Sequence, residues 1–166
     1  MPILDQNTLE FISRSPEQTK RIGSYLGTLL KTGDVICLQG ELGAGKTTFV
    51  QGIVQGWGSN DVVTSPTFVL INEYHRTDPV EMHHLDSYRL KDAADTEVLD
   101  LDSILENGIL LVEWPDRIKS ALPGENLWIE MSWVADEQRR LLFNPHGNRF
   151  QILVQKIRQS LFNDQS

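Results

Sequence analysis

The chain has 166 residues, of which 40 % are hydrophobic, and its 23 acidic and 15 basic side chains give a net charge of −8. This length supplies one sizeable core, so we expect a single domain over residues 1–166 with no room for a second. The negative charge argues against a protein that grips nucleic acid directly, since such proteins are basic, and any link to RNA should run through a partner.

The amino-terminal part of the chain predicts a strand followed by a helix. Residues 8–13 alternate loosely, as a strand does, and Ser15, Pro16 and Gln18 supply an N-cap, a first-turn proline and a capping-box partner for the helix. The apolar stripe of this helix is typical of packing and not of a ligand site. We expect the helix to end at Gly33, which would serve as its left-handed cap.

The phosphate-binding pattern of a glycine, four residues and Gly-Lys-Thr occurs in residues 40–48, which read GELGAGKTT. An apolar run precedes this loop over residues 34–39, and apolar side chains at helical spacing follow it over residues 46–55, which is the strand, loop and helix that the motif requires. Backbone N–H groups and the helix dipole would hold a triphosphate there, Lys46 would reach its β- and γ-phosphates, and Thr47 would hold Mg²⁺. The alternative is a glycine turn that only caps a helix. The nucleotide-binding residues predicted in this loop are Glu41, Leu42, Gly43, Ala44, Gly45, Lys46, Thr47 and Thr48.

The segment SPTF at residues 65–68 predicts extended backbone one connection downstream of the phosphate loop, because Pro66 keeps Ser65 out of the helical region. In phosphate-loop hydrolases a threonine on such a segment can approach the γ-phosphate and its metal, so Thr67 is a candidate catalytic residue. An ordinary beginning of a strand explains the same spacing equally well, and the sequence leaves both interpretations open.

Two acidic residues follow apolar strands. Asp86 ends the alternating run MHHLD, and Glu113 follows the apolar run ILLV. An acid at the carboxyl end of a strand faces the ligand edge of an α/β sheet, so we expect Asp86 at that edge and Glu113 beside the phosphate loop. Glu113 is a candidate to hold the metal through water, to polarise the attacking water, or both, and the alternative is an acid that only begins a loop. His83 and His84 are adjacent and would point to opposite faces of a strand, so we predict that both are structural, with one close to the site.

The carboxyl-terminal part of the chain predicts an antiparallel hairpin and a helix. Residues 126–134 alternate strongly and residues 138–143 form a matching partner, so we expect a hairpin that closes one edge of the sheet. Before them, residues 95–108 predict a short acidic helix, and after them Phe150 to Leu161 recur at helical spacing. These elements predict an α/β three-layer phosphate-loop NTPase fold with a mostly parallel central sheet and a C-terminal antiparallel hairpin.

The cysteine content and the apolar runs predict that the protein is cytoplasmic and has no membrane span. Cys37 is the one cysteine and lies inside an apolar run, so we expect a small core residue in a reducing, cytoplasmic environment. No amino-terminal apolar segment resembles a signal peptide, and no run approaches the roughly 18 apolar residues of a membrane span. We therefore expect a soluble protein with no membrane partner.

Five segments resemble the TsaE family of bacterial tRNA threonylcarbamoyladenosine biosynthesis, and together they cover nearly the whole chain. They are SPEQT at 15–19, GELGAGKTTFVQG at 40–52, SPTF at 65–68, HLDSYRL at 84–90 and LVEWPDRI at 111–118. The phosphate loop alone indicates only a superfamily, whereas SPTF, the HLDxYRL segment and VEWP in this order make the resemblance specific. One departure is Asp100, where we expect a glycine.

The resemblance implies ATP as the nucleotide and Mg²⁺ as the cofactor. It implies that Thr47 and Glu113 are metal ligands, that Asp86 is an acid needed for hydrolysis at the same metal site, that Thr67 lies in a switch-like segment, and that Ser15 lies near the adenine. It also implies TsaB and TsaD as protein partners. ATP turnover would then sustain the enzyme that transfers threonylcarbamoyl to adenosine of tRNA, with tRNA contacted only through the complex.

Other functions share the phosphate loop. A small-molecule or nucleoside kinase is the alternative, and Arg139 and Arg140 could form its lid, but they lie in an apparent hairpin and the sequence indicates no acceptor pocket. A GTPase is disfavoured because no Asn-Lys-x-Asp guanine motif occurs. A third possibility is a nucleotide-gated binding module in which turnover is incidental.

Overall fold

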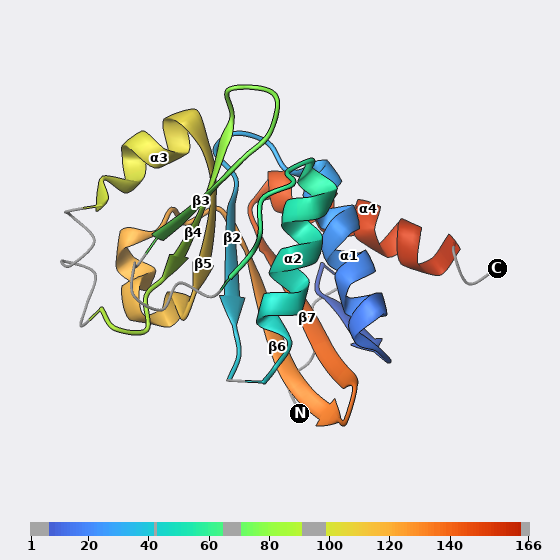
Figure 1. Cartoon of the computed structure of the whole chain (residues 1–166). Coiled ribbons are helices and arrows are strands. Elements are labelled where there is room, and N and C mark those ends of the chain that lie inside the picture. The colour runs from blue at the N-terminus through green and yellow to red at the C-terminus, as the bar shows by residue number, and fades with distance from the viewer. Residues whose placement is uncertain (1–6, 42, 65–70, 91–98, 164–166) are drawn as a thin grey trace.

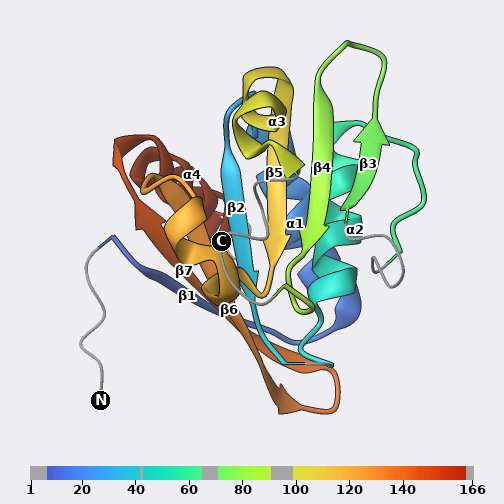
Figure 2. The same cartoon turned by 90° about the vertical axis from the view of Figure 1, so that its left-hand side faces the viewer.

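The computed structural model has one mixed sheet with helices on both faces (Figures 1 and 2). It describes residues 7–41, 43–64, 71–90 and 99–163. The elements in chain order are β1 (Leu9–Ser13), α1 (Pro16–Leu29), β2 (Val35–Gln39), α2 (Lys46–Trp57), β3 (Ile71–His75), β4 (Glu81–Asp86), α3 (Leu101–Asn107), β5 (Gly108–Glu113), the 3-10 helix η2 (Pro115–Ala121), β6 (Asn126–Ala135), β7 (Gln138–His146) and α4 (Asn148–Asn163). Within these ranges, the helices are too short or too polar to cross a bilayer.

The sheet is parallel at its centre and antiparallel at both edges. Its strand order is β1-β7-β6-β2-β5-β4-β3, and the four central strands β6, β2, β5 and β4 run parallel. β3 pairs antiparallel with β4, and β7 pairs antiparallel with both β6 and β1. The predicted α/β fold with a parallel core and a C-terminal hairpin is confirmed. The prediction that this hairpin closes the sheet edge is wrong, because β1 adds beyond β7 and forms that edge.

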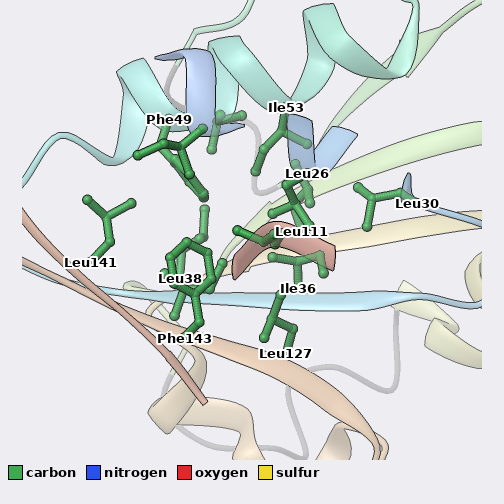
Figure 3. Packing of buried hydrophobic residues seen from close by; sticks show 14 of the residues in the cluster. Leu26, Leu30, Ile36, Leu38, Phe49, Ile53, Leu111, Leu127, Leu141 and Phe143 are labelled. Atoms are coloured by element: carbon green, nitrogen blue, oxygen red, sulfur yellow. The ribbon is translucent and has the colours of Figure 1, made fainter. Parts of the chain in front are cut away.

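The sheet separates two apolar cores, because successive side chains of a strand point to opposite faces. Ile36 and Leu38 of β2 face the larger core, under α1, α2 and α4, whereas Val35 and Cys37 face the smaller one, under α3 and η2. Figure 3 shows Phe49 of α2 directed from its helix toward the side chains of the sheet in the larger core. Cys37 is fully buried as predicted, and burial raises the pKa of its thiol to about 12.

Four glycines allow α1 and α2 to pack backbone against backbone. Gly23 and Gly27 lie four residues apart on α1, and Gly52 and Gly56 lie four apart on α2, so each pair occupies one face of its helix. A Cβ at Gly27 would overlap the carbonyl oxygen of Ile53, and a Cβ at either glycine of α2 would overlap a carbonyl oxygen of α1. The phosphate-loop helix is therefore fixed in place by its close approach to α1.

Helix α1 begins as predicted but ends earlier. The Ser15 hydroxyl accepts a hydrogen bond from the Gln18 N–H at 3.1 Å, which confirms the N-cap. The helix ends at Leu29 and not at Gly33, whose φ of 93° lies in the turn before β2. Arg149 of α4 donates to the Leu29 carbonyl at 2.7 Å and so satisfies an acceptor at this early end.

The predicted acidic helix corresponds in part to α3. Asp100 begins this helix at a φ of 49°, in the left-handed region that favours glycine, and its carboxylate accepts from the Ser103 N–H at 3.4 Å. An aspartate therefore adopts the left-handed backbone conformation, at the start of the helix, that we expected of a glycine. The helix ends at Asn107 as predicted, and residues 91–98 lie outside the described part of the chain.

Candidate functional site

The phosphate loop connects the carboxyl end of β2 to the first turn of α2, in the arrangement that the sequence predicts. Gly43 and Gly45 have φ angles of 84° and 94°, which few other residues adopt. The Ala44 N–H donates to the Glu41 carbonyl at 3.1 Å and tightens the loop. Leu42, also a predicted nucleotide ligand, lies outside the described residues.

A cleft of about 710 Å³ opens over this loop at the carboxyl edge of the parallel strands. Pockets that hold small molecules span roughly 300 to 1,000 Å³, so its size suits a nucleotide. Of the predicted site residues, the cleft brings together Gly43, Gly45, Lys46, Thr47, Thr48, Asp86 and Glu113. Tyr88, Trp114 and Arg139 complete its lining.

Lys46 and Glu113 meet inside this cleft. The Nζ atom of Lys46 lies 3.9 Å from Oε1 of Glu113 and 4.4 Å from the centre of the Trp114 ring. Both side chains are buried, with exposed fractions of 9 % and 7 %. Desolvation by burial lowers the pKa of Lys46, although the charges of Glu113 and Asp86 act to raise it. The ammonium group therefore has little water around it and only a long contact to its carboxylate, which leaves it able to bind an anion.

A buried chain of hydrogen bonds fixes Glu113. Its Oε2 atom accepts from Nε2 of His84 at 2.7 Å, and Nδ1 of His84 lies 2.9 Å from the Tyr74 hydroxyl. Because an ionised carboxylate can only accept, Nε2 carries the proton of the first bond. Burial acts to raise the pKa of Glu113, but the hydrogen bond from His84 and the charges of His84 and Lys46 together leave this pKa below its ordinary value. Glu113 is thus ionised, with Oε1 toward Lys46.

Asp86 lies beside Glu113 at the same edge, because β4 and β5 are parallel and these two residues are paired in register. Its Oδ1 atom accepts from the Tyr88 N–H at 2.9 Å. The Ser87 hydroxyl lies 2.7 Å from the Glu113 carbonyl oxygen and 2.6 Å from that of Trp114, and holds the two strand ends together. Two carboxylates that follow neighbouring strands, as the sequence pattern predicts, therefore border one cleft.

The remaining predicted site residues are not among the described residues that line the larger cleft. Thr67 and the rest of SPTF fall outside the described residues. Glu41 and Ala44 line a neighbouring cleft of about 630 Å³ beside the β6–β7 hairpin. Ser15 lines neither cleft, and its hydroxyl caps α1. A role of these residues in nucleotide binding stays a prediction.

Three contributors to the site were not assigned to it from the sequence. His84 shares a strand face with Asp86, two residues away, and this spacing could have identified which of the two histidines approaches the site. Trp114, over which Lys46 lies, follows a candidate acid directly in sequence. Arg139 donates from Nε to the Gly43 carbonyl at 3.1 Å, a contact between residues 96 positions apart that no local pattern indicates.

Comparisons with known proteins agree on one family. The model of the family described as "Threonylcarbamoyl adenosine biosynthesis protein TsaE" matches residues 13–141, which include the phosphate loop and both acids. The chain is 39 % identical over 150 residues to the tRNA threonylcarbamoyladenosine biosynthesis protein TsaE of Bacillus subtilis, covering 90 % of this chain and 93 % of the relative. It is 37 % identical over 131 residues to the protein of the same name from Treponema pallidum, covering 78 % of this chain and 96 % of the relative.

A solved structure is similar over almost the same length. The crystal structure of Bacillus subtilis YdiB matches with a TM-score of 0.76 and 34 % identity, covering 92 % of this chain and 95 % of that one. The fold, the phosphate loop with its two acids, and these sequence matches lead to one conclusion. The chain belongs to the TsaE family.

Proposed function

We propose that this chain is a Mg²⁺-dependent ATPase that supports a TsaB–TsaD complex in the transfer of threonylcarbamoyl to adenosine of tRNA. The observation that carries the proposal is the meeting of Lys46 and Glu113 beside the amino end of α2, at the ligand edge of the sheet. The family and the names of the relatives support the tRNA-modification role. The net charge of −8 supports a partner that holds the tRNA in place of this chain.

The residues of the cleft fit Mg²⁺ and a triphosphate. The Thr47 hydroxyl and the carboxylates of Asp86 and Glu113 are oxygen ligands, which Mg²⁺ binds directly or through water. The ion would neutralise charge on the phosphates during transfer. Lys46 would bind the phosphate oxygens with its poorly solvated ammonium group. Glu113, held ionised by His84, would orient the attacking water or the metal's own water.

The test measures phosphate release from ATP by the chain alone and with the TsaB–TsaD pair, for the wild type and for Lys46→Ala, Asp86→Ala and Glu113→Ala. We expect the pair to raise turnover, Lys46→Ala to weaken nucleotide binding, and the two acid variants to lower kcat more than they raise KM. A wild-type chain that takes up no adenine nucleotide in the presence of Mg²⁺ overturns the proposal.

The same assay separates the ATPase from the kinase alternative. Arg139, a lid candidate for a kinase, donates to the Gly43 carbonyl and to carbonyls of its own hairpin, so its guanidinium is already engaged with the backbone. If a free nucleoside or metabolite becomes phosphorylated while the TsaB–TsaD pair leaves the rate unchanged, the kinase replaces the ATPase.

A further inference from the structure

The β3–β4 hairpin carries a second group of ionisable side chains, on the opposite face of β4 from His84. In the antiparallel pairing, Glu73 lies directly opposite His83, and His75 lies directly opposite Glu81. Residues two apart on a strand share a face, so these four side chains form a two-by-two grid of histidines and carboxylates. Figure 2 shows this hairpin at the free edge of the sheet.

Three donor atoms of the grid converge on one point. The Nε2 atom of His83 lies 3.4 Å from Oε1 of Glu73 and 3.5 Å from Oε2 of Glu81. One donor atom from each of the three residues lies within 4.8 Å of the other two. Charge-assisted hydrogen bonds are shorter, at about 2.7 to 2.9 Å. Ligands bound about 2.0 to 2.1 Å from a tetrahedral Zn²⁺ ion stand about 3.3 to 3.4 Å apart, which is close to the separations seen here.

His83 is the buried member of the group. Its side chain is 8 % exposed, and its Nδ1 atom has no hydrogen-bond partner within the described part of the chain. Buried polar side chains are normally hydrogen-bonded, and Nε2, the nitrogen of His83 that is directed between the two carboxylates, has contacts of 3.4 and 3.5 Å there. Glu73 and Glu81 are 49 % and 40 % exposed, so an ion could reach them from solvent. The donor oxygens of Glu73 and Glu81 lie within 4.8 Å of each other, so the two carboxylates repel, and a cation between them would offset that repulsion.

We propose that Glu73, Glu81 and His83 form a binding site for a divalent transition-metal ion of the zinc class. One imidazole nitrogen and two carboxylate oxygens are a ligand set that Zn²⁺ accepts, with water at the remaining position, and the two carboxylates balance its charge. The site lies on the opposite face of β4 from His84 and does not depend on the proposed ATPase function. The ion would tie the edge strand β3 to β4 and would stabilise the folded chain by mass action.

The test titrates the full-length, tag-free protein with ZnCl₂ alone after metal is removed with a chelator. Calorimetry should show one Zn²⁺ ion per chain with a Kd below about 10 μM, and the thermal midpoint should rise. Glu73→Gln and Glu81→Gln keep the size of partly exposed side chains, so they should fold, and each should weaken binding at least about 10-fold. His83→Gln should do the same. The matched control His146→Gln, at an exposed histidine that ends β7, should bind Zn²⁺ like the wild type.

Each other outcome counts against the site. Absence of Zn²⁺ binding by the wild type means that the grid holds ion pairs only, and overturns the proposal. Equal weakening by His146→Gln and His83→Gln means that the ion binds surface histidines without selection, which overturns it as well. Because the titration contains no nucleotide, and because Lys46→Ala should keep the Zn²⁺ affinity, failure of this proposal is distinct from failure of the proposed ATPase.

Discussion

Helix α2 is held in two different ways along its length. Its first turn places Lys46 beside Glu113 and Trp114, where buried charges face a cleft. Its second half presents Gly52 and Gly56 to the backbone of α1, so closely that an added Cβ would overlap a carbonyl oxygen of that helix. Buried charge is unfavourable for folding and useful for binding, whereas close packing is favourable for folding. Substitutions among the side chains that surround this first turn should therefore impair activity more than stability, and substitutions at the glycines should do the reverse.

The largest effect is expected for Glu113→Gln. This change keeps the shape of the side chain but removes the charge opposite Lys46, so ATP turnover should fall by about 10²- to 10³-fold. The change also leaves the buried Lys46 ammonium without its carboxylate, so the thermal midpoint should fall as well, but turnover per folded molecule should fall much further. Phosphate-release kinetics and thermal melts measure the two quantities. Glu106→Gln, at an exposed residue of α3, is the matched control. A variant that unfolds without losing turnover per folded molecule would remove the proposed distinction.

Gly27→Ala should destabilise the close contact between α1 and α2 without changing turnover. Its new Cβ would overlap the Ile53 carbonyl oxygen, so we expect the free energy of unfolding to fall by about 3 kcal/mol. This loss outweighs the roughly 1 kcal/mol by which alanine favours a helix over glycine. Urea denaturation measures this loss. Turnover per folded molecule should be unchanged, because the cleft is not touched.

Gly124→Ala provides the control for that prediction. A Cβ at Gly124 meets nothing within 4 Å, so its stability should stay within about 0.5 kcal/mol of the wild type. Equal destabilisation by both alanines would contradict close helix packing as the cause.

Tyr74→Phe should have a smaller effect on turnover, through the hydrogen bonds that fix Glu113. The change removes the hydroxyl that lies 2.9 Å from Nδ1 of His84, so the imidazole that holds Glu113 is less well fixed. The loss of one buried hydrogen bond, about 1 kcal/mol, should lower turnover about 5-fold.

The pH dependence of turnover distinguishes this positioning role from a general loss of structure. The pKa of Glu113 lies below its ordinary value, so its ionised form is present above that pKa and is lost as the pH falls through it. Weaker support from His84 raises this pKa, and the acid limb of the pH–rate profile should move to higher pH. A uniform drop in rate with an unmoved acid limb would contradict the role of Tyr74.

Local patterns predicted the features of the site that depend on neighbours in sequence. The phosphate loop with Lys46 follows from glycines between an apolar run and a helical repeat, and the positions of Asp86 and Glu113 follow from apolar runs that end on an acid. The fold class followed from the same alternation of strands and helices. In each case the physical cause acts within about ten residues, the range over which periodicity has meaning.

The features that the sequence did not predict depend on tertiary packing. The contact of Arg139 with Gly43 and the placement of β1 outside β7 join segments that are far apart in sequence. The paired glycines of α1 and α2 were visible as two four-residue spacings, but their meaning requires knowledge that these two helices touch. At the early end of α1, the Leu29 carbonyl accepts a hydrogen bond from Arg149 of α4, a partner that is distant in sequence.

The smallest effect is expected for Arg139→Ala, at the rim of the first region. This arginine donates to the Gly43 carbonyl at 3.1 Å in an exposed position. Its loss should destabilise the phosphate-loop conformation by the free energy of one surface hydrogen bond, about 0.5 to 1 kcal/mol. The KM for ATP should rise about 3-fold with kcat little changed. Arg76→Ala is the matched control, because this arginine also donates to a backbone carbonyl, that of Trp57 at the other end of α2, and its KM should equal that of the wild type. A large loss of kcat in Arg139→Ala would contradict this. It would mean that the guanidinium contacts the reacting phosphate, so that the β6–β7 hairpin contributes a catalytic residue to the cleft.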